Sequence, residues 1–535
     1  MTFIRPRLFL ALSALFVPYS AALAGETAVP LQCQNVRLNA PLGPDQEVPG
    51  FQVALDGTER VLFLSDVVLD EEFDALTVPQ DGSAPPTLFD IDRIPGRFLN
   101  GLPKLAIPTS RVVIVGDFET LDQDEIFSVS TATGGGPLTR LNPSMVEGGD
   151  IRAFAISPDG TTVAYAADQE VDQKIELYRV DIDGGNVTKL SDPADASADV
   201  DRRFEISSDS RYVVFRVDGT SFRTNLFSAD LTTGDRVQLN ENPDDRGSVS
   251  SDVLISPDGA TVVYRADQES NLLELFAVPI AGGTAVKISG PEITNSARDP
   301  VISADSGQVV YLEPIQQNLY SVPIVGGTPV NLTESNSPDS VREFVLSGDR
   351  VVYEAFIDGA QRIFTVPIAG GPLIQLSGDP NTIGTTDEFV VSPDSQQIAY
   401  AAVSTGGVGP GFRVVRAVSI DGSNDRPITG QGVPGGDIRT FEITPDNQQL
   451  VFSGDFLIDG QRELFAVSLN VPGPVRRINS PLPDGAAVGA SFNDDFQQTL
   501  DGMRVVYLAD QNTQGVKELF SADIRCDDLF ADGFE

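Results

Sequence analysis

Short apolar runs separated by turn signals recur along the chain, and this pattern predicts β-strands. Residues 161–168 (TTVAYAAD) and 175–182 (IELYRVDI) are short and β-rich. The turn Ser157-Pro158-Asp159-Gly160 precedes the first of them, and Gly184-Gly185 after the second suits a tight hairpin. No stretch after the first 24 residues keeps a 3.6-residue apolar period. We therefore expect an all-β chain.

The sequence contains an internal repeat. The stretch that begins at Ile156 matches the one that begins at Ile255 over its whole length, and each predicts four strands, the last of them short, as in residues 187–191 (VTKLS). The turn aspartate recurs at positions 159, 209, 258, 305, 349, 394, 446 and 501, so successive turns lie 44 to 55 residues apart. Four short strands in a unit of this length are typical of a β-propeller blade.

Ten copies of the unit can be traced, which predicts a single propeller of about ten blades. Eight or nine blades is the alternative, because the two copies before Ile151 match the pattern least well. An aromatic residue recurs at the centre of the third strand, as at Tyr178 and Phe276. We expect this column to pack in the core between neighbouring units.

The order S-P-D-G, VAYAAD, IELYRVDIDGG and KLS resembles the WD40-like repeats of the TolB-type periplasmic propellers. The resemblance extends from about Cys33 to Cys526. It implies propeller blades and says little about function, because unrelated proteins share such folds. The chain differs from the TolB protein itself in having more than six repeats and no separate α/β domain.

The two ends of the chain predict how the ring closes. The last copy supplies three strands and then meets Cys526, whereas Val36–Asn39 (VRLN) aligns with fourth strands such as residues 139–142 (TRLN). We expect this N-terminal strand to complete the last blade, since an unpaired edge would invite aggregation. Cys33 and Cys526 are the two cysteines of the chain. A disulfide between them would replace the missing turn at the seam, and two free thiols or an intermolecular bond are the alternatives.

Residues 1–24 have the three parts of a secretory signal: Arg5 and Arg7, the apolar run Leu8–Val17, and small residues before Gly25. The run is shorter than the 20 or so residues that span a bilayer. We therefore expect export of a propeller that spans residues 25–526, to the periplasm of a Gram-negative bacterium or beyond it. Residues 527–535 form a short acidic tail, for which a sorting tag and plain terminal disorder are both open.

Composition narrows the function. The 36 basic and 77 acidic residues give a net charge of −41, which repels phosphate backbones and anionic lipid, so neither nucleic acid nor a membrane is an expected partner. The chain has no histidine, which excludes Ser-His-Asp and Cys-His nucleophiles and histidine-bound metals. We expect a monomeric, non-catalytic binding or scaffold module for a protein or glycan. A carboxylate-based glycan-processing enzyme is the less favoured alternative, and the sequence indicates no catalytic pair.

Several predicted second strands end in an aspartate, and the blade pattern places these residues on one rim. Asp117, Asp168, Asp267 and Asp510 are candidates for calcium binding, since calcium takes carboxylate and carbonyl oxygens. A calcium-stabilised structural propeller is therefore a further alternative. The spacing D-x-[DN]-x-[DN]-G is absent. The other interpretation, which we favour, is that each aspartate caps its own turn through backbone N–H bonds.

Overall fold

The computed structural model describes residues 35–525, except 44–45, 55–58, 70–71, 89–98, 100–102, 107–108, 132–136, 192–197, 219–222, 242–246, 291–295, 335–337, 379–387, 405–411, 431, 434, 472–473 and 490–495. The predicted signal (residues 1–24), Cys33, Cys526 and the tail 527–535 lie outside the described residues, so the predictions about them stand as predictions. Within the described ranges, no helix is long and apolar enough to cross a membrane.

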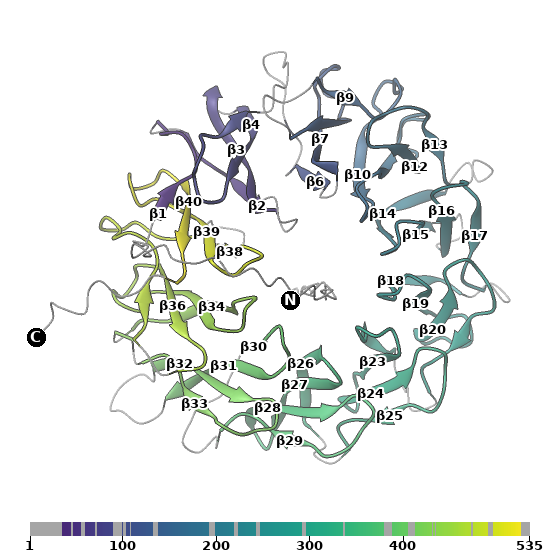
Figure 1. Ribbon diagram of the computed structural model, residues 1–535. Coiled ribbons are helices and arrows are strands. Elements are labelled where there is room, and N and C mark those ends of the chain that lie inside the picture. Colours follow the sequence, from purple (N-terminus) through teal and green to yellow (C-terminus); the bar gives the residue numbers. More distant parts are fainter. Residues whose placement is uncertain are drawn as a thin grey trace, which may run out of the picture.

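The strands form ten four-stranded antiparallel sheets, arranged as blades around a common centre (Figure 1). The first five blades are made of β2 (Gly50–Val53), β3 (Arg60–Leu69), β4 (Glu72–Pro79) and β5 (Thr87–Leu88); β6 (Lys104–Ala106), β7 (Arg111–Gly116), β8 (Glu125–Ser130) and β9 (Thr139–Arg140); β10 (Ile151–Ile156), β11 (Thr162–Ala167), β12 (Glu176–Asp181) and β13 (Thr188–Lys189); β14 (Asp199–Ile206), β15 (Tyr212–Asp218), β16 (Thr224–Asp230) and β17 (Arg236–Gln238); and β18 (Val249–Ile255), β19 (Thr261–Ala266), β20 (Glu274–Pro279) and β21 (Val286–Lys287).

Blades 6 to 10 are made of β22 (Arg298–Ile302), β23 (Gln308–Glu313), β24 (Asn318–Pro323) and β25 (Val330–Asn331); β26 (Ser340–Ser347), β27 (Arg350–Ile357), β28 (Ala360–Pro367) and β29 (Ile374–Gln375); β30 (Phe389–Val391), β31 (Gln397–Ser404), β32 (Phe412–Ser419) and β33 (Arg426–Pro427); β34 (Ile438–Ile443), β35 (Gln449–Gly454), β36 (Glu463–Ser468) and β37 (Arg476–Arg477); and β38 (Phe496–Gln498), β39 (Arg504–Ala509) and β40 (Glu518–Asp523), with β1 (Asn35–Arg37) as the fourth strand of blade 10.

The two ends of the chain close the ring in blade 10, as predicted. Strand β1 pairs antiparallel with β40, with Asn35 opposite Ala522 and Arg37 opposite Phe520. The strand begins and ends earlier than the predicted Val36–Asn39, and the next residues still bind the blade, since Leu38 N donates to Leu519 O over 2.8 Å. The predictions of ten blades and of closure by the N-terminal strand are both confirmed.

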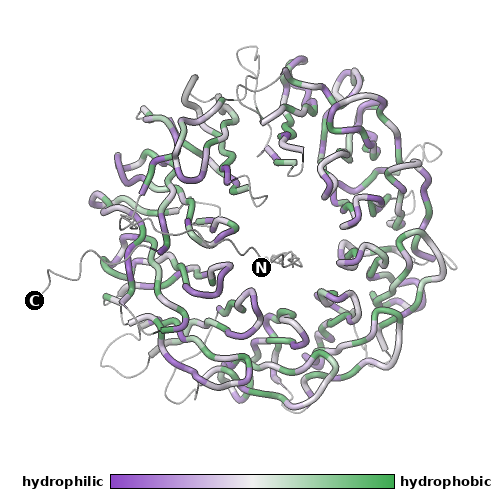
Figure 2. Tube along the Cα trace, viewed as in Figure 1, coloured by the Kyte–Doolittle hydropathy of each residue, from purple (hydrophilic) through white to green (hydrophobic). Residues whose placement is uncertain are grey.

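The core lies between blades. Ten clusters of buried apolar side chains each join two adjacent blades, and in Figure 2 hydrophobic stretches recur around the whole ring. The cluster between blades 10 and 1 contains Leu38, Val61 and Leu519, all under 5% exposed. Because every junction is sealed in this way, the ten sheets form one continuous ring of packed layers.

The predicted aromatic column is in this core, and it has a partner that sequence reasoning missed. Tyr178 stacks on Tyr165 of the neighbouring strand, with ring centroids 5.4 Å apart, and the two residues are directly opposite in register. Tyr264 and Phe276 repeat the arrangement at 5.6 Å. Such cross-strand aromatic pairs stabilise a sheet beyond their buried area.

Each blade presents two ends, which we call the aspartate rim and the hairpin rim. The aspartate rim carries the loops between second and third strands, such as residues 168–175, and the hairpin rim carries the first-to-second turns and the third-to-fourth hairpins. In Figure 1 the first strand of each blade lies nearest the centre of the ring. Any ligand at the centre therefore meets first strands.

The turns on the hairpin rim link neighbouring blades. Asp159 N donates to Ser210 Oγ of the next blade at 2.9 Å, and Asp258 N donates to Ser306 Oγ at 3.0 Å. The hairpin glycines also link neighbouring blades, because they allow the hairpin to pack closely on the blade before it. At Gly282, where φ is +94°, a Cβ would lie 2.8 Å from Val237 of the preceding blade. The double glycines thus serve close packing between blades as well as a turn.

Candidate functional site

The aspartates at the ends of second strands hold the loops of the aspartate rim. Asp168 Oδ1 accepts a hydrogen bond from Asp150 N at 2.7 Å, and its Oδ2 accepts from Gln173 N at 3.1 Å. Asp510 accepts in the same way from Ala487 N at 2.6 Å and Gly515 N at 2.9 Å. Each carboxylate therefore ties its own loop to the segment that enters the blade.

These contacts set the acidity of both groups. Burial would raise the pKa of Asp168, but the Arg152 side chain and the N–H donors outweigh burial and hold the pKa below its usual value. The pKa of Asp510 is lowered likewise, since the N–H groups of Gly515 and Ala487 and the Lys517 ammonium outweigh burial. Both carboxylates are thus ionised near neutral pH and occupied by protein donors.

The four calcium candidates are on one rim, as predicted, but in four different blades. Asp267 Oδ1 accepts from Gly247 N at 3.0 Å, and Asp117 Oδ2 accepts from Asp122 N at 3.4 Å. No three acidic side chains gather as a metal-binding group among the residues that the structure describes. The contacts follow the turn-capping interpretation, and calcium binding stays a hypothesis for experiment.

A column of buried glutamates begins the third strands, and sequence reasoning missed it. In five blades a glutamate that is 0–5% exposed pairs with a basic residue of the fourth strand. The pairs are Glu125–Arg140, Glu176–Lys189, Glu274–Lys287, Glu463–Arg477 and Glu518–Arg37. The sequence does carry a signal for it: glutamate two residues before the aromatic, and lysine or arginine two residues before the serine or asparagine that follows the fourth strand. In these five blades the pair holds the fourth strand onto the third.

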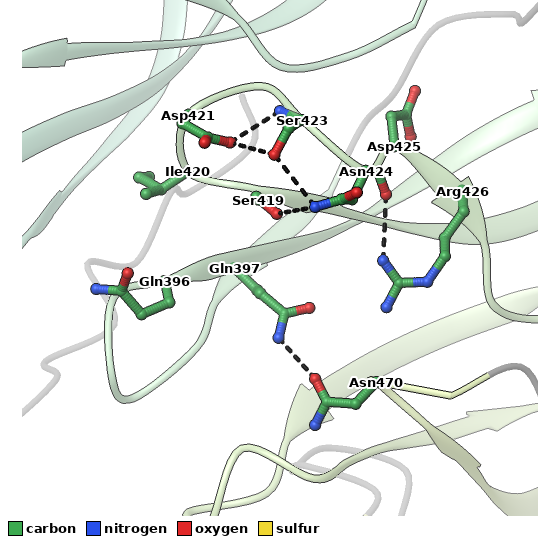
Figure 3. A pocket seen from close by; sticks show the side chains of 10 residues that line it. All are labelled: Gln396, Gln397, Ser419, Ile420, Asp421, Ser423, Asn424, Asp425, Arg426 and Asn470. Carbon is green, nitrogen blue, oxygen red and sulfur yellow. Dashed lines mark hydrogen bonds between the residues drawn. The ribbon is translucent and has the colours of Figure 1, made fainter.

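A polar hollow of about 820 Å³ opens on the hairpin rim between blades 8 and 9 (Figure 3). Its lining comes from the start of β31, the β32–β33 hairpin and the end of the third strand of blade 9: Gln396, Gln397, Ser419, Ile420, Asp421, Ser423, Asn424, Asp425, Arg426 and Asn470. Gln397 Nε2 donates to Asn470 Oδ1 at 2.8 Å and so joins the two blades across it.

The hollow exists because the hairpin of blade 9 departs from the repeat. In blades 3 to 8 a positive-φ glycine packs its hairpin onto the fourth strand of the preceding blade, as Gly422 does against Ile374. Blade 9 has Asn470 and the exposed Val471 in this place. Instead of a glycine contact, Arg426 of blade 8 donates a hydrogen bond to Leu469 O of blade 9, and polar side chains line the space between the two blades.

The lining of the hollow suits a ligand rich in hydroxyl groups. Asp421 Oδ1 accepts from Ser423 N at 2.9 Å and from Ser423 Oγ at 2.6 Å, which lowers the pKa of Asp421. Asp425 accepts from the Tyr400 hydroxyl at 2.9 Å, and burial together with that carboxylate raises the pKa of Tyr400 to about 12. Gln396, Asp421 and Asn424 are exposed and can exchange hydrogen bonds with a ligand.

Exposed apolar side chains mark the loops of the aspartate rim. Leu121, Val171, Ile315, Leu457 and Ile458 are 47–62% exposed. All five lie between the second and third strands, in blades 2, 3, 6 and 9. An apolar residue thus recurs at the same structural position on one side of the ring.

Comparison with known proteins adds little beyond the fold. No protein family matches the sequence, and no curated protein does. Solved structures that resemble the chain include a prolyl endopeptidase (14% identity, TM-score 0.34, 66% of this chain and 54% of that one). An oligogalacturonate lyase with manganese (12%, TM-score 0.33, 80% and 97%) and a putative TolB from Agrobacterium tumefaciens (17%, TM-score 0.27, 45% and 83%) also resemble it. This chain spans about half the length of the endopeptidase. At these identities and TM-scores the likenesses carry no statement about ligand or activity.

Proposed function

We propose that the protein is an exported, non-catalytic binding module that holds a partner on its aspartate rim. The observation that carries this proposal is the recurrence of exposed apolar side chains in the loops of that rim. Single exposed apolar residues are ordinary on protein surfaces, whereas exposed apolar residues that recur together are characteristic of interaction sites. The hairpin rim also exposes Val325, Val471 and Leu500, and the aspartate rim is preferred because its five residues all lie in second-to-third loops.

The loops that carry these side chains are anchored, which favours binding. The loop with Leu121 is tied by Gln123 Nε2 to Val146 O at 2.7 Å, and the loop with Val171 by the Asp168 carboxylate to Gln173 N. A partner that meets loops already held in place loses less conformational entropy on binding. The same rigidity is what a scaffold requires.

A pull-down from the native envelope and culture medium tests the proposal. The bait is wild-type protein or the variant L121S/I315S/I458S. The control variant V325S/V471S/L500S removes apolar groups that are at least as exposed on average, from the hairpin rim. We expect a protein retained by wild type and control and lost from the aspartate-rim variant. Equal retention by both variants would overturn the proposal.

Glycan binding in the hollow between blades 8 and 9 is the second candidate, favoured by its amide and carboxylate lining. Isothermal titration with neutral oligosaccharides should then show heat that is lost in Q396A/N424A. Unchanged heat in that variant would remove the hollow as the site. Release of new reducing ends during the same incubation would instead support the carboxylate-based enzyme.

A further inference from the structure

Arginine recurs at one position of the first strands. Counting back five residues from the serine or threonine that begins each first-to-second turn gives Arg152, Arg202, Arg298, Arg342 and Arg439. The chain as a whole has fewer than half as many basic as acidic residues, 36 against 77. The first strands together carry seven basic and seven acidic residues, so the strands nearest the centre are far less acidic than the molecule as a whole.

β-Bulges present these side chains. Arg152, Arg342 and Arg439 are each the extra residue where the register of the first strand shifts against the second. Arg202 lies inside the wider bulge of β14, and Arg298 directly precedes that of β22. A bulge leaves its extra residue out of the ladder and re-aims its side chain, and bulges are frequent beside functional sites.

Four of the five arginines are available to a ligand. Arg152 is held by Asp168 at 3.0 Å and by Asp150 at 3.2 Å. Arg202, Arg298, Arg342 and Arg439 are exposed, and none makes an ion pair within the part of the chain that the structure describes. We call these four the arginine ring.

The carboxylates nearby are in part already engaged. Asp201 pairs with Arg216, and Asp252 pairs with Arg265 at 2.7 Å. Asp299 and Glu343 adjoin two ring arginines, and burial together with the charge of Asp252 raises the pKa of Asp299. The arginine ring, with Arg203 beside Arg202, therefore offers positive charge on the first strands.

We propose that the arginine ring receives an acidic segment of a partner protein seated on the aspartate rim. The first strands begin at that rim, so the ring arginines and the exposed apolar loops lie at the same end of the blades. Arginine with apolar side chains is the composition enriched at protein interfaces, and the guanidinium fork matches carboxylates. The four arginines belong to blades 4, 6, 7 and 9, so an extended segment suits them better than one small anion.

The acidity of the rest of the molecule does not prevent this contact. At physiological ionic strength charges are screened beyond about 8 Å, so the inner wall acts through its own local charges. The inference rests on the proposed function, and it specifies that the partner contributes an acidic segment.

Binding of a fluorescein-labelled deca-glutamate peptide, followed by anisotropy in physiological salt, tests the inference. Wild type should bind this peptide and not labelled deca-glutamine. R202S/R298S/R342S/R439S should bind at least tenfold more weakly, with serine chosen because Ser251 occupies the same position in blade 5. S251R should strengthen binding. V325R adds the same charge to the hairpin rim and should change nothing.

The outcomes separate this inference from the proposed function. Absent binding by wild type, or equal binding by a quadruple variant whose thermal unfolding is unchanged, overturns the inference. If the quadruple variant unfolds at a lower temperature than wild type, the comparison of peptide binding by S251R and V325R tests the inference by itself. Alginate or dextran sulfate binding more tightly than the peptide would make the ligand a glycan and also overturn it. A partner recovered on the aspartate rim without peptide binding leaves the proposed function standing.

Discussion

Arg37 Nη1 lies 2.9 Å from Glu518 Oε1, although the two residues are 481 positions apart in the chain. The pair repeats at the seam what Arg140 and Glu125 do inside blade 2, at 3.0 Å. Asn39 completes the likeness, because its Oδ1 accepts from Leu519 N at 2.7 Å as Asn142 Oδ1 accepts from Ile126 N at 2.9 Å. The ring thus closes with the contacts of an ordinary blade.

Removal of Arg37 should weaken the ring. R37A leaves Glu518, which is 3% exposed on its side chain, without its cation, and we expect the free energy of unfolding to fall by about 1–3 kcal/mol. Denaturant titration measures the change. R140A is the matched control inside one blade and should cost a similar amount, while faster proteolysis near residue 35 should follow R37A alone. Equal proteolysis in the two variants would contradict a seam held by this pair.

The hairpin glycines should resist substitution according to what a Cβ would meet. G282A places a methyl group 2.8 Å from Val237 at a φ of +94°, so we expect a loss of about 1–3 kcal/mol. Gly359 also has a positive φ, +75°, but nothing lies within 4 Å of its Cβ position. G359A should therefore cost less, and equal unfolding midpoints for the two variants would refute the role of the blade contact.

Acid should destabilise the fold through the capping aspartates. The folded-state pKa values of Asp159, Asp168, Asp258 and Asp510 are lowered, so their contribution is full above the unfolded-state pKa of about 4 and is lost as pH falls below it. Melting temperature measured between pH 7 and pH 3 should fall more steeply for wild type than for D510N. Parallel curves would mean that folding does not lower the pKa of Asp510.

Calcium should not stabilise the protein. The oxygens of Asp168 and Asp510 already accept backbone N–H bonds, which a cation would have to displace. We expect neither heat in calorimetry of chelator-treated protein nor a shift in melting temperature on adding calcium. A clear rise in melting temperature that D168N or D510N removes would establish a metal site at these loops.

A disulfide between Cys33 and Cys526 should be found in the exported protein. Asn35 and Ala522, which follow and precede the two cysteines closely, are paired in β1 and β40. Reduction should then raise the intact mass by about 2 Da and lower stability by up to about 5 kcal/mol. An unchanged mass would leave two free thiols, and a mass that halves would show an intermolecular bond.

The sequence predicts the fold well and the site poorly, for physical reasons. Blade number, the turn pattern and the orphan strand at residues 36–39 depend on local signals that are repeated ten times, so each copy supports the others. The stacked Tyr165–Tyr178 pair and the buried Glu–Arg pairs also recur, but each joins positions on different strands. The hollow beside Asn470 could not be predicted, because it depends on a contact that one hairpin fails to make with the blade before it.

The seam gives the molecule a defined response to tension. Asn35 begins β1 and Asp523 ends β40, and these ends lie at the same end of the antiparallel pair. A pulling force on the two termini would therefore break the hydrogen bonds between β1 and β40 one after another, before it reached any other blade. A Cys33–Cys526 disulfide would carry this force in place of those hydrogen bonds. The ring would then be mechanically continuous in an oxidising compartment and releasable in a reducing one.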